Sequence, residues 1–232
     1  MKKALLLSAS SYKDTGYLVH CRDWIKDFLG DNWNEEILFI PFAGVSRTFD
    51  EYELKARTQL QNENIKSIHR FDDFKEAIKN AKTIAIGGGN TFMLTHLLYK
   101  YDLMDEIRKA VENGTPYFGW SAGANIAGKT MMTTNDMPII FPKSFDAINL
   151  FPSQINPHFI SGKFTGHNGE SREQRIKEFN IANPKEAVYA LPEGTALEIN
   201  GNEAIVRGYD DILKFKFNEE PQIIKLGSVI KF

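Results

Sequence analysis

Cysteine is nearly absent from this sequence, and so are long apolar runs. The only cysteine among the 232 residues is Cys21, so no disulfide can form within the chain, which is typical of proteins from reducing compartments. We therefore expect a cytoplasmic protein, in which Cys21 is a buried, unreactive thiol on a helix over residues 17–29. No apolar stretch approaches the roughly 20 residues that cross a membrane. The short run after Lys2 and Lys3 is predicted to be a strand rather than a signal peptide.

An excess of charge of either sign is also missing. The formal net charge is −2, acidic and basic residues are mixed along the chain, and no long basic run occurs. A nucleic-acid partner is therefore not expected. The sequence has no H-E-x-x-H motif, no CxxC pair and no dense cluster of aspartate and histidine. Because metal sites usually show such patterns, we expect neither a metal nor another cofactor.

Apolar runs of strand length alternate with helical patterns through the first half of the chain. Strands are predicted at 3–7, 37–42, 65–69, 83–86 and 117–120, and helices at 16–29, 48–62, 72–80, 91–99 and 102–113. The strands are apolar on both sides, as expected when helices cover both faces of a parallel sheet. The pattern predicts an α/β fold of three layers with a mostly parallel central sheet.

The alternation loosens after residue 130. Residues 133–170 carry several Pro, Gly, Asn and Ser residues, and a loop region of this length is more often functional than idle. A helix at 171–182 and a strand at 187–191 follow. The tail is predicted to form antiparallel strands at 196–199, 204–207 and 212–217, with Asn200-Gly201 as a hairpin turn. Since no repeat, low-complexity segment or linker interrupts the chain, residues 1–232 are predicted to form a single domain.

The strongest local signal is Gly119-Trp120-Ser121-Ala122-Gly123, which follows a predicted strand and leads into small residues. It matches the nucleophile-elbow pattern G-x-S-x-G, in which a sharp strand-to-helix turn exposes a serine hydroxyl. Ser121 is therefore the candidate nucleophile. The simpler alternative is a tight turn whose glycines serve only packing.

A second glycine-rich turn, Gly87-Gly88-Gly89-Asn90-Thr91, also follows a predicted strand. Ligands of open α/β sheets bind at the carboxyl ends of the strands, so both turns can share one site. Backbone N–H groups of this turn and of Ala122 are expected to stabilise a developing oxyanion. A phosphate-binding loop is the rival interpretation, but the spacing of both common phosphate motifs is missing.

A serine hydroxyl needs a general base near neutral pH, and the base needs an acceptor that orients it. His158, in Asn156-Pro157-His158-Phe159, is the favoured base because it lies within the functional-looking loop region, and His167 is its competitor. Asp136 and Glu193 are the candidate orienting carboxylates. The order of such residues along the chain does not choose between them, because triads occur in several orders.

Together with Thr133-Thr134-Asn135-Asp136-Met137-Pro138 and Leu191-Pro192-Glu193-Gly194, these motifs resemble the peptidase E family. The resemblance runs over nearly the whole chain. It implies a fold similar to class I glutamine amidotransferases and flavodoxin, and a serine dipeptidase for substrates with N-terminal aspartate (Asp-X).

The resemblance also implies roles for single residues. Ser121 would be the nucleophile and His158 the base, Asp136 or Glu193 the acid, and Gly88 and Ala122 the oxyanion donors. Arg172 would hold the aspartate side chain of the substrate, consistent with bidentate binding of a carboxylate by a guanidinium. Arg175 is an alternative, and Asn90 is expected to contact substrate as well.

Three other functions remain open at this point. A cyanophycinase-like hydrolase of a β-aspartyl-arginine polymer would share the triad, and an esterase would share G-x-S-x-G. A non-catalytic ligand-binding protein of the same fold is the third. The expected partner is a small peptide substrate, and a homodimer is left open.

Overall fold

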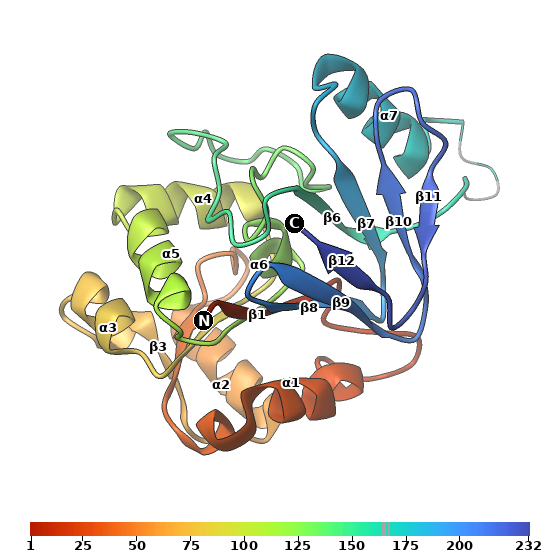
Figure 1. Ribbon diagram of the computed structural model, residues 1–232. Helices are drawn as coiled ribbons and strands as arrows, with labels where there is room; N and C mark the ends of the chain where they lie inside the picture. Colours follow the sequence, from red (N-terminus) through yellow and green to blue (C-terminus); the bar gives the residue numbers. More distant parts are fainter. Residues whose placement is uncertain (164–165, 167) are drawn as a thin grey trace.

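The computed structural model of the protein describes residues 1–163, 166 and 168–232, and within these ranges its strands form two sheets (Figure 1). The main sheet consists of β1 (Lys3–Leu7), β2 (Ile37–Ile40), β3 (Ile65–Ser67), β4 (Thr83–Ile86), β5 (Tyr117–Trp120), β8 (Thr195–Asn200), β9 (Glu203–Gly208) and β12 (Val229–Lys231). The second sheet consists of β6 (Gln154–Phe159), β7 (Val188–Pro192), β10 (Ile212–Phe215) and β11 (Gln222–Ile224).

The strand order of the main sheet is β12-β9-β8-β1-β5-β4-β2-β3. The strands from β1 to β3 in this order pair in parallel, whereas β8, β9 and β12 add antiparallel pairs on the other side of β1. In the second sheet, β6 and β7 are parallel and lie next to the antiparallel strands β10 and β11. The predicted α/β class, with a mostly parallel centre and antiparallel C-terminal strands, is confirmed.

Helices lie where the sequence pattern predicts them, and their ends follow capping chemistry. At α2, the Thr48 hydroxyl accepts from the Glu51 N–H, and the Glu51 carboxylate accepts from the Thr48 N–H. Ser171 and Gln174 form the same reciprocal capping box at α7. The α-helices are α1 (Arg22–Leu29), α2 (Phe49–Leu60), α3 (Phe74–Asn80), α4 (Thr91–Lys100), α5 (Met104–Glu112), α6 (Ala122–Asn125) and α7 (Arg172–Ala182), with 3-10 turns at Val19–Cys21, Gly30–Asn34 and Ile68–Arg70.

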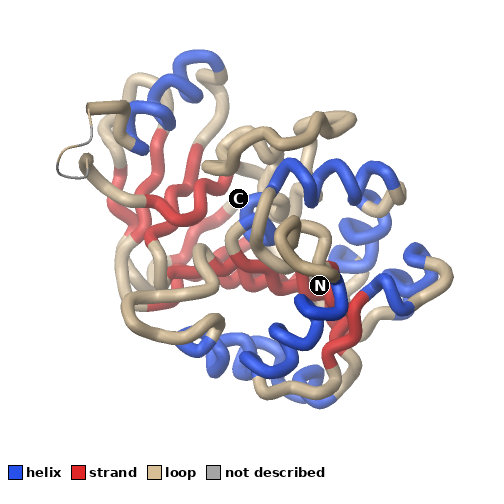
Figure 2. The backbone as a smooth tube through the Cα atoms, turned by 180° about the vertical axis from the view of Figure 1, so that it is seen from behind, coloured by secondary structure: helices blue, strands red, loops and turns tan. Residues whose placement is uncertain are grey.

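Alternate residues of the parallel strands face two different cores. Leu5 and Leu7 pack with α1 and α2 on one face of the main sheet, whereas Ala4 and Leu6 pack with α3, α4, α5 and α6 on the other. Figure 2 shows the backbone from behind, with the strands in red and the helices that cover them in blue. Burial on both faces explains why these strands are apolar throughout.

The second sheet has its own helix, and it contains the main departure from the predicted elements. α7 packs against this sheet through a cluster that includes Phe159, Ile176 and Phe215 (Figure 1). Residues of β6, predicted as part of a long loop, form an edge strand of this sheet. Its Asn-Pro-His sequence is a poor strand signal because proline cannot donate to a ladder, but an edge strand tolerates it. The short strands β11 and β12 were also not predicted.

Cys21 is fully buried at the 3-10 turn that precedes α1, so the expected helix begins later than predicted. Burial raises the pKa of its thiol to about 12. Among the described residues, no helix is long and apolar enough to span a membrane.

Candidate active site

Ser121 lies at the sharp turn between β5 and α6, as the elbow motif predicts. Its backbone has φ 55° and ψ −110°, a strained conformation for a residue with a side chain. The turn is held on both sides: the Ser121 N–H donates to the Leu7 carbonyl at 3.0 Å, and the Ser121 carbonyl accepts from the Asn125 N–H at 2.9 Å. The serine side chain therefore lies at the carboxyl ends of the parallel strands of the main sheet.

The glycines of the elbow are required by close packing. A methyl group at Gly123 would overlap the carbonyl group of Ile86 in the neighbouring strand β4. A methyl group at Gly119 would lie 2.6 Å from the Gly123 carbonyl oxygen. The packing role and the exposed serine are thus two consequences of the same tight turn.

His158 is the histidine that meets Ser121. Its Nε2 lies 2.9 Å from the Ser121 Oγ, and its Nδ1 lies 2.8 Å from the Glu193 Oε1. This pattern suits the tautomer in which Nδ1–H donates to the carboxylate and Nε2 accepts from the serine hydroxyl. The side chains of His158 and Glu193 are 35% and 46% exposed, so a substrate can reach the site from solvent.

Glu193 follows directly on the end of β7. The next residue, Gly194, has φ 76°, and a methyl group there would lie 2.5 Å from the ring of Tyr12. The charge of Glu193 also acts on buried His20: burial lowers the pKa of His20, and the nearby carboxylate partly opposes this shift. Glu193 therefore lies between the partly exposed His158 and a packed group of aromatic rings.

Asp136, the other predicted carboxylate, does not contact His158. Its Oδ2 accepts hydrogen bonds from the Thr91 N–H at 2.7 Å, the Thr91 hydroxyl at 2.6 Å and the Thr134 hydroxyl at 3.1 Å. These contacts place a negative charge at the first turn of α4, where it is favourable. Of the two candidate acids, the structure brings only Glu193 to the histidine.

The two expected oxyanion donors belong to segments that adjoin Ser121. A methyl group at Gly88 would lie 3.0 Å from the Ser121 Cβ, so the backbone of this loop rests against the serine. The loop is anchored by the Tyr52 hydroxyl, which donates to the Gly88 carbonyl at 2.7 Å. Ala122 is the first residue of α6, where a backbone N–H has no acceptor within the helix.

Asn90, which was expected to contact substrate, has both polar side-chain atoms in structural hydrogen bonds. Its Oδ1 caps α4 by accepting from the Met93 N–H at 3.0 Å, and its Nδ2 donates to the Met137 carbonyl at 2.9 Å. The structure gives this side chain a role in holding the loop that carries Asp136.

Arg172, the first residue of α7, lies near Asp136 across a small cavity. The cavity has a volume of about 160 Å³, and its lining includes Asp136, Asn156, Arg172 and Arg175. Burial lowers the pKa of Arg172, the charge of Arg175 lowers it further, and Asp136 opposes both. Among the described residues, no carboxylate lies within ion-pairing distance of Arg172, whereas the Arg175 Nε lies 3.9 Å from a carboxylate oxygen of Glu170. The arrangement leaves Arg172 able to bind an incoming anion.

The loop that carries Asp136 is tied to β6 just before His158, a connection that the sequence did not reveal. The Asn135 Nδ2 donates to the Pro157 carbonyl at 2.7 Å, and the Asn156 Nδ2 donates to the Asn135 Oδ1 at 2.9 Å. Ser8 contacts His158 directly through its hydroxyl and was also missed. The only available signal was its position after the predicted first strand. His167, the competing base, lies outside the described residues.

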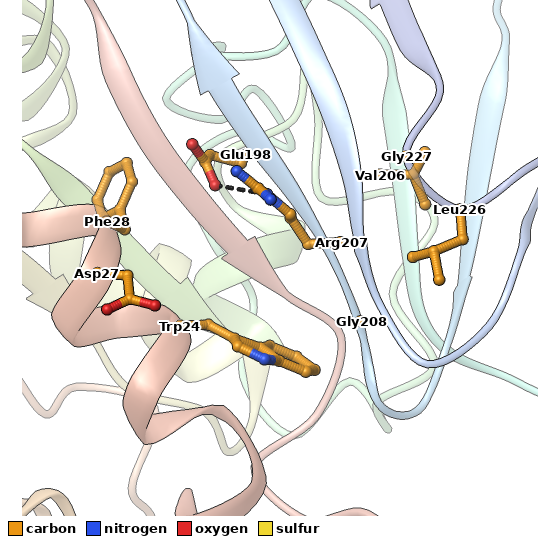
Figure 3. A pocket seen from close by; sticks show the side chains of 9 residues that line it. All are labelled: Trp24, Asp27, Phe28, Glu198, Val206, Arg207, Gly208, Leu226 and Gly227. Atoms are coloured by element: carbon orange, nitrogen blue, oxygen red, sulfur yellow. Dashed lines mark hydrogen bonds and ion pairs between the residues drawn. The ribbon is translucent and has the colours of Figure 1, made fainter.

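A different pocket, of about 400 Å³, lies between α1 and the β8–β9 hairpin (Figure 3). None of the predicted site residues lines it, and its Glu198 and Arg207 pair with each other at 2.8 Å. In the described part of the chain, no three His, Cys, Asp or Glu side chains are grouped so that they could hold a metal ion.

The chain is similar in sequence and in fold to known peptidases. Residues 4–207 match the family model described as peptidase family S51. The chain is 58% identical over 217 residues to a peptidase E of Actinobacillus pleuropneumoniae, with 93% of each chain covered. It is 54% identical over 234 residues to a peptidase E of Pasteurella multocida, with 100% of each covered. Among solved structures, a peptidase from an acI-B1 Actinobacterium superposes with a TM-score of 0.72 at 20% identity, over 100% of this chain and 97% of the other, which shows a shared fold.

Proposed function

The chain belongs to peptidase family S51 and is a serine-type peptidase. We propose that it hydrolyses dipeptides with N-terminal aspartate through an acyl-enzyme on Ser121. The observation that carries the proposal is the continuous hydrogen-bond chain from Ser121 through His158 to Glu193, with distances of 2.9 and 2.8 Å. Such a chain supplies a nucleophile, its base and the group that orients the base.

In the first half of the reaction, the Ser121 oxygen attacks the carbonyl carbon of the Asp–X bond while the His158 Nε2 accepts the hydroxyl proton. Glu193 stabilises the resulting imidazolium through Nδ1–H. The tetrahedral intermediate then collapses, the C–N bond breaks, and His158 returns the proton to the leaving amine of X. In the second half, His158 accepts a proton from water, the water oxygen displaces Ser121 from the acyl group, and the serine recovers its proton.

The negative charge of both tetrahedral intermediates falls on the former carbonyl oxygen. We assign its stabilisation to the backbone N–H groups of Gly88 and Ala122, because their segments flank Ser121. Removing one such donor typically costs about 3 kcal/mol of transition-state stabilisation. Both donors are backbone groups, so side-chain substitution alone does not remove them.

Arg172 supports the preference for aspartate. It is half-buried, its charge lacks a close carboxylate partner among the described residues, and it borders a cavity that also includes Asn156, two residues before His158. A substrate carboxylate can satisfy its guanidinium with two parallel hydrogen bonds. Asp136 lines the same cavity and limits the net positive charge, so a single carboxylate is matched better than a phosphate.

The test is hydrolysis of Asp-Leu against Asn-Leu, Glu-Leu and Ala-Leu, with and without a metal chelator. Asn is nearly isosteric with Asp, so the ratio of their kcat/KM values isolates the charge. Loss of one partner of a desolvated charge pair costs about 2–5 kcal/mol, which corresponds to a ratio of about 30 or more.

Two variants assign this ratio to a residue. Arg172→Gln should bring the Asp/Asn ratio close to one, whereas Arg175→Gln should leave most of it, because the Arg175 side chain is 62% exposed. Equal rates for Asp-Leu and Asn-Leu in the wild-type protein would contradict the proposed specificity. If no dipeptide is cleaved, a β-aspartyl-arginine polymer and simple acyl esters are the next substrates to test.

A further inference from the structure

Ser8 follows β1 and is completely buried, and its hydroxyl joins the two sheets. The Ser8 Oγ accepts a hydrogen bond from the backbone N–H of His158 at 2.9 Å and donates one to the Leu191 carbonyl at 2.7 Å. The direction of both bonds is determined, because an N–H can only donate and a carbonyl can only accept. The single proton and one lone pair of the hydroxyl are therefore both used.

The end of β1 contacts all three segments that carry the proposed triad. The Leu7 carbonyl accepts from the Ser121 N–H, and the Ser8 hydroxyl accepts from the His158 N–H. Ser8 also contacts the chain on both sides of Glu193. Its hydroxyl donates to the carbonyl of Leu191, two residues before Glu193, and its N–H donates to the carbonyl of Thr195, two residues after Glu193, at 2.9 Å. Two consecutive residues thus form hydrogen bonds with the segments that carry the proposed nucleophile, base and acid.

His158 needs such support because its own backbone is strained. It has φ 53°, in the left-handed region, and the pairing of β6 with β7 shifts register between Asn156 and Phe159, around this residue. A non-glycine residue keeps such a conformation only where its surroundings enforce it. The peptide unit between Pro157 and His158 is held by two hydrogen bonds: the Asn135 Nδ2 donates to its carbonyl at 2.7 Å, and its N–H donates to the Ser8 hydroxyl.

We propose that Ser8 is a positioning residue, whose hydrogen bonds keep His158 and Glu193 at hydrogen-bonding distance from their partners in the proposed triad. The proposal rests on the proposed function, since it assigns a purpose to this alignment. Ser8 touches neither substrate nor reacting atoms, so its effect must pass through the histidine. A displacement of about 1 Å at a reacting group lowers the rate about a hundredfold.

Three substitutions at Ser8 separate its hydroxyl from its volume. Ser8→Ala removes both hydrogen bonds and leaves a buried N–H and a buried carbonyl without this partner. Ser8→Cys keeps a similar volume but offers only a weak donor and acceptor. Ser8→Thr restores the hydroxyl. The matched control is Ser67→Ala, because Ser67 is also completely buried and bonds to a histidine, with its Oγ 2.7 Å from the His69 Nδ1. Ser67 ends β3, an edge strand that β5, β4 and β2 separate from β1.

We expect kcat of Ser8→Ala and Ser8→Cys on Asp-Leu to fall about a hundredfold, with KM changed less than about threefold. Ser8→Thr should recover most of this loss, and Ser67→Ala should keep the wild-type kcat. A second readout does not require turnover: the downfield proton resonance of the His158 Nδ1–H bound to Glu193, identified by its loss in Glu193→Gln. It should be present in the wild type and in Ser67→Ala, and broadened or lost in Ser8→Ala and Ser8→Cys.

Wild-type kcat in Ser8→Ala or Ser8→Cys, together with an unchanged downfield resonance, would overturn the proposal and leave Ser8 a packing residue only. If Ser8→Ala does not fold, the conservative Ser8→Cys decides between these outcomes. If the wild type fails to cleave Asp-X dipeptides, the proposed function fails, while the resonance still decides whether Ser8 positions His158.

Discussion

The assignment of Glu193 as the acid can be tested most sharply by replacing it with glutamine, which keeps the shape and removes the charge. The Glu193 Oε1 lies 2.8 Å from the His158 Nδ1. At this distance opposite unit charges attract by about 1.5 kcal/mol in water and by about 3 kcal/mol at an effective dielectric constant of about 40. Since both side chains are partly exposed, the value for this site falls in that range.

This attraction is gained only when His158 becomes an imidazolium, so its loss appears in the transition state. We expect Glu193→Gln to lower kcat/KM by about 10-fold to 150-fold through charge alone. A larger loss, up to about 10⁴-fold, follows if the new amide N–H donates to Nδ1, because the remaining proton then sits on Nε2 and blocks acceptance from Ser121.

Asp136→Asn is the comparison, because the notable contacts of Asp136 are with Thr91 and Thr134 at the start of α4. Asparagine can still accept a hydrogen bond from Thr91 at the start of α4. Its neutral side chain no longer balances the positive charge of Arg172, and the charge–dipole attraction of about 0.5–1 kcal/mol is lost. This corresponds to a fall in Tm of about 1–4 °C. We expect kcat to stay within about fivefold of wild type.

Both variants should be measured by steady-state hydrolysis of Asp-Leu near pH 7 and by thermal unfolding. The assignment would be refuted if Asp136→Asn lost a hundredfold or more in kcat while Glu193→Gln stayed within about threefold. A Glu193→Gln protein with wild-type rates would show that the carboxylate beside His158 is not used in the reaction.

Three further outcomes follow from the structure. Ser121→Ala should fold with wild-type Tm, because alanine and serine carry the same Cβ in this strained turn, and should lose about 10⁴-fold or more in kcat; residual turnover near wild type would exclude Ser121 as the nucleophile. Gly123→Ala should lower Tm by about 4–8 °C, the effect of about 2 kcal/mol of overlap with Ile86, and an unchanged Tm would contradict the packing argument. Cys21 should resist iodoacetamide in the folded protein at pH 8.5. Burial raises the pKa of the Cys21 thiol to about 12, above the usual value of about 8.5 in an unfolded chain. The contribution of the neutral thiol to the free energy of unfolding is therefore complete below about pH 8.5 and is lost as the pH rises toward about 12. The urea midpoint of the wild type should fall over this range, and that of Cys21→Ala should fall less steeply.

Several features of this protein follow from the sequence because they depend on neighbouring residues. The apolar runs of the parallel strands alternate with helical patterns, and burial on both sheet faces requires such runs. The elbow around Ser121 is local in part, because glycine at position 119 clears the Gly123 carbonyl four residues on, whereas Gly123 clears Ile86 of the neighbouring strand β4. The capping boxes at Thr48 and Ser171 mark two helix starts for the same reason.

Other features depend on which segments meet in space, and only the tertiary structure decided them. Asp136 and Glu193 are equally acidic in the sequence, but Asp136 reaches the start of α4 while Glu193 reaches His158. Ser8 carries no sequence signal, since a serine after a strand is common and its partners lie on β6 and β7. The physical reason is that a hydrogen bond acts over about 3 Å, so its partners are set by the packing of two sheets rather than by distance along the chain.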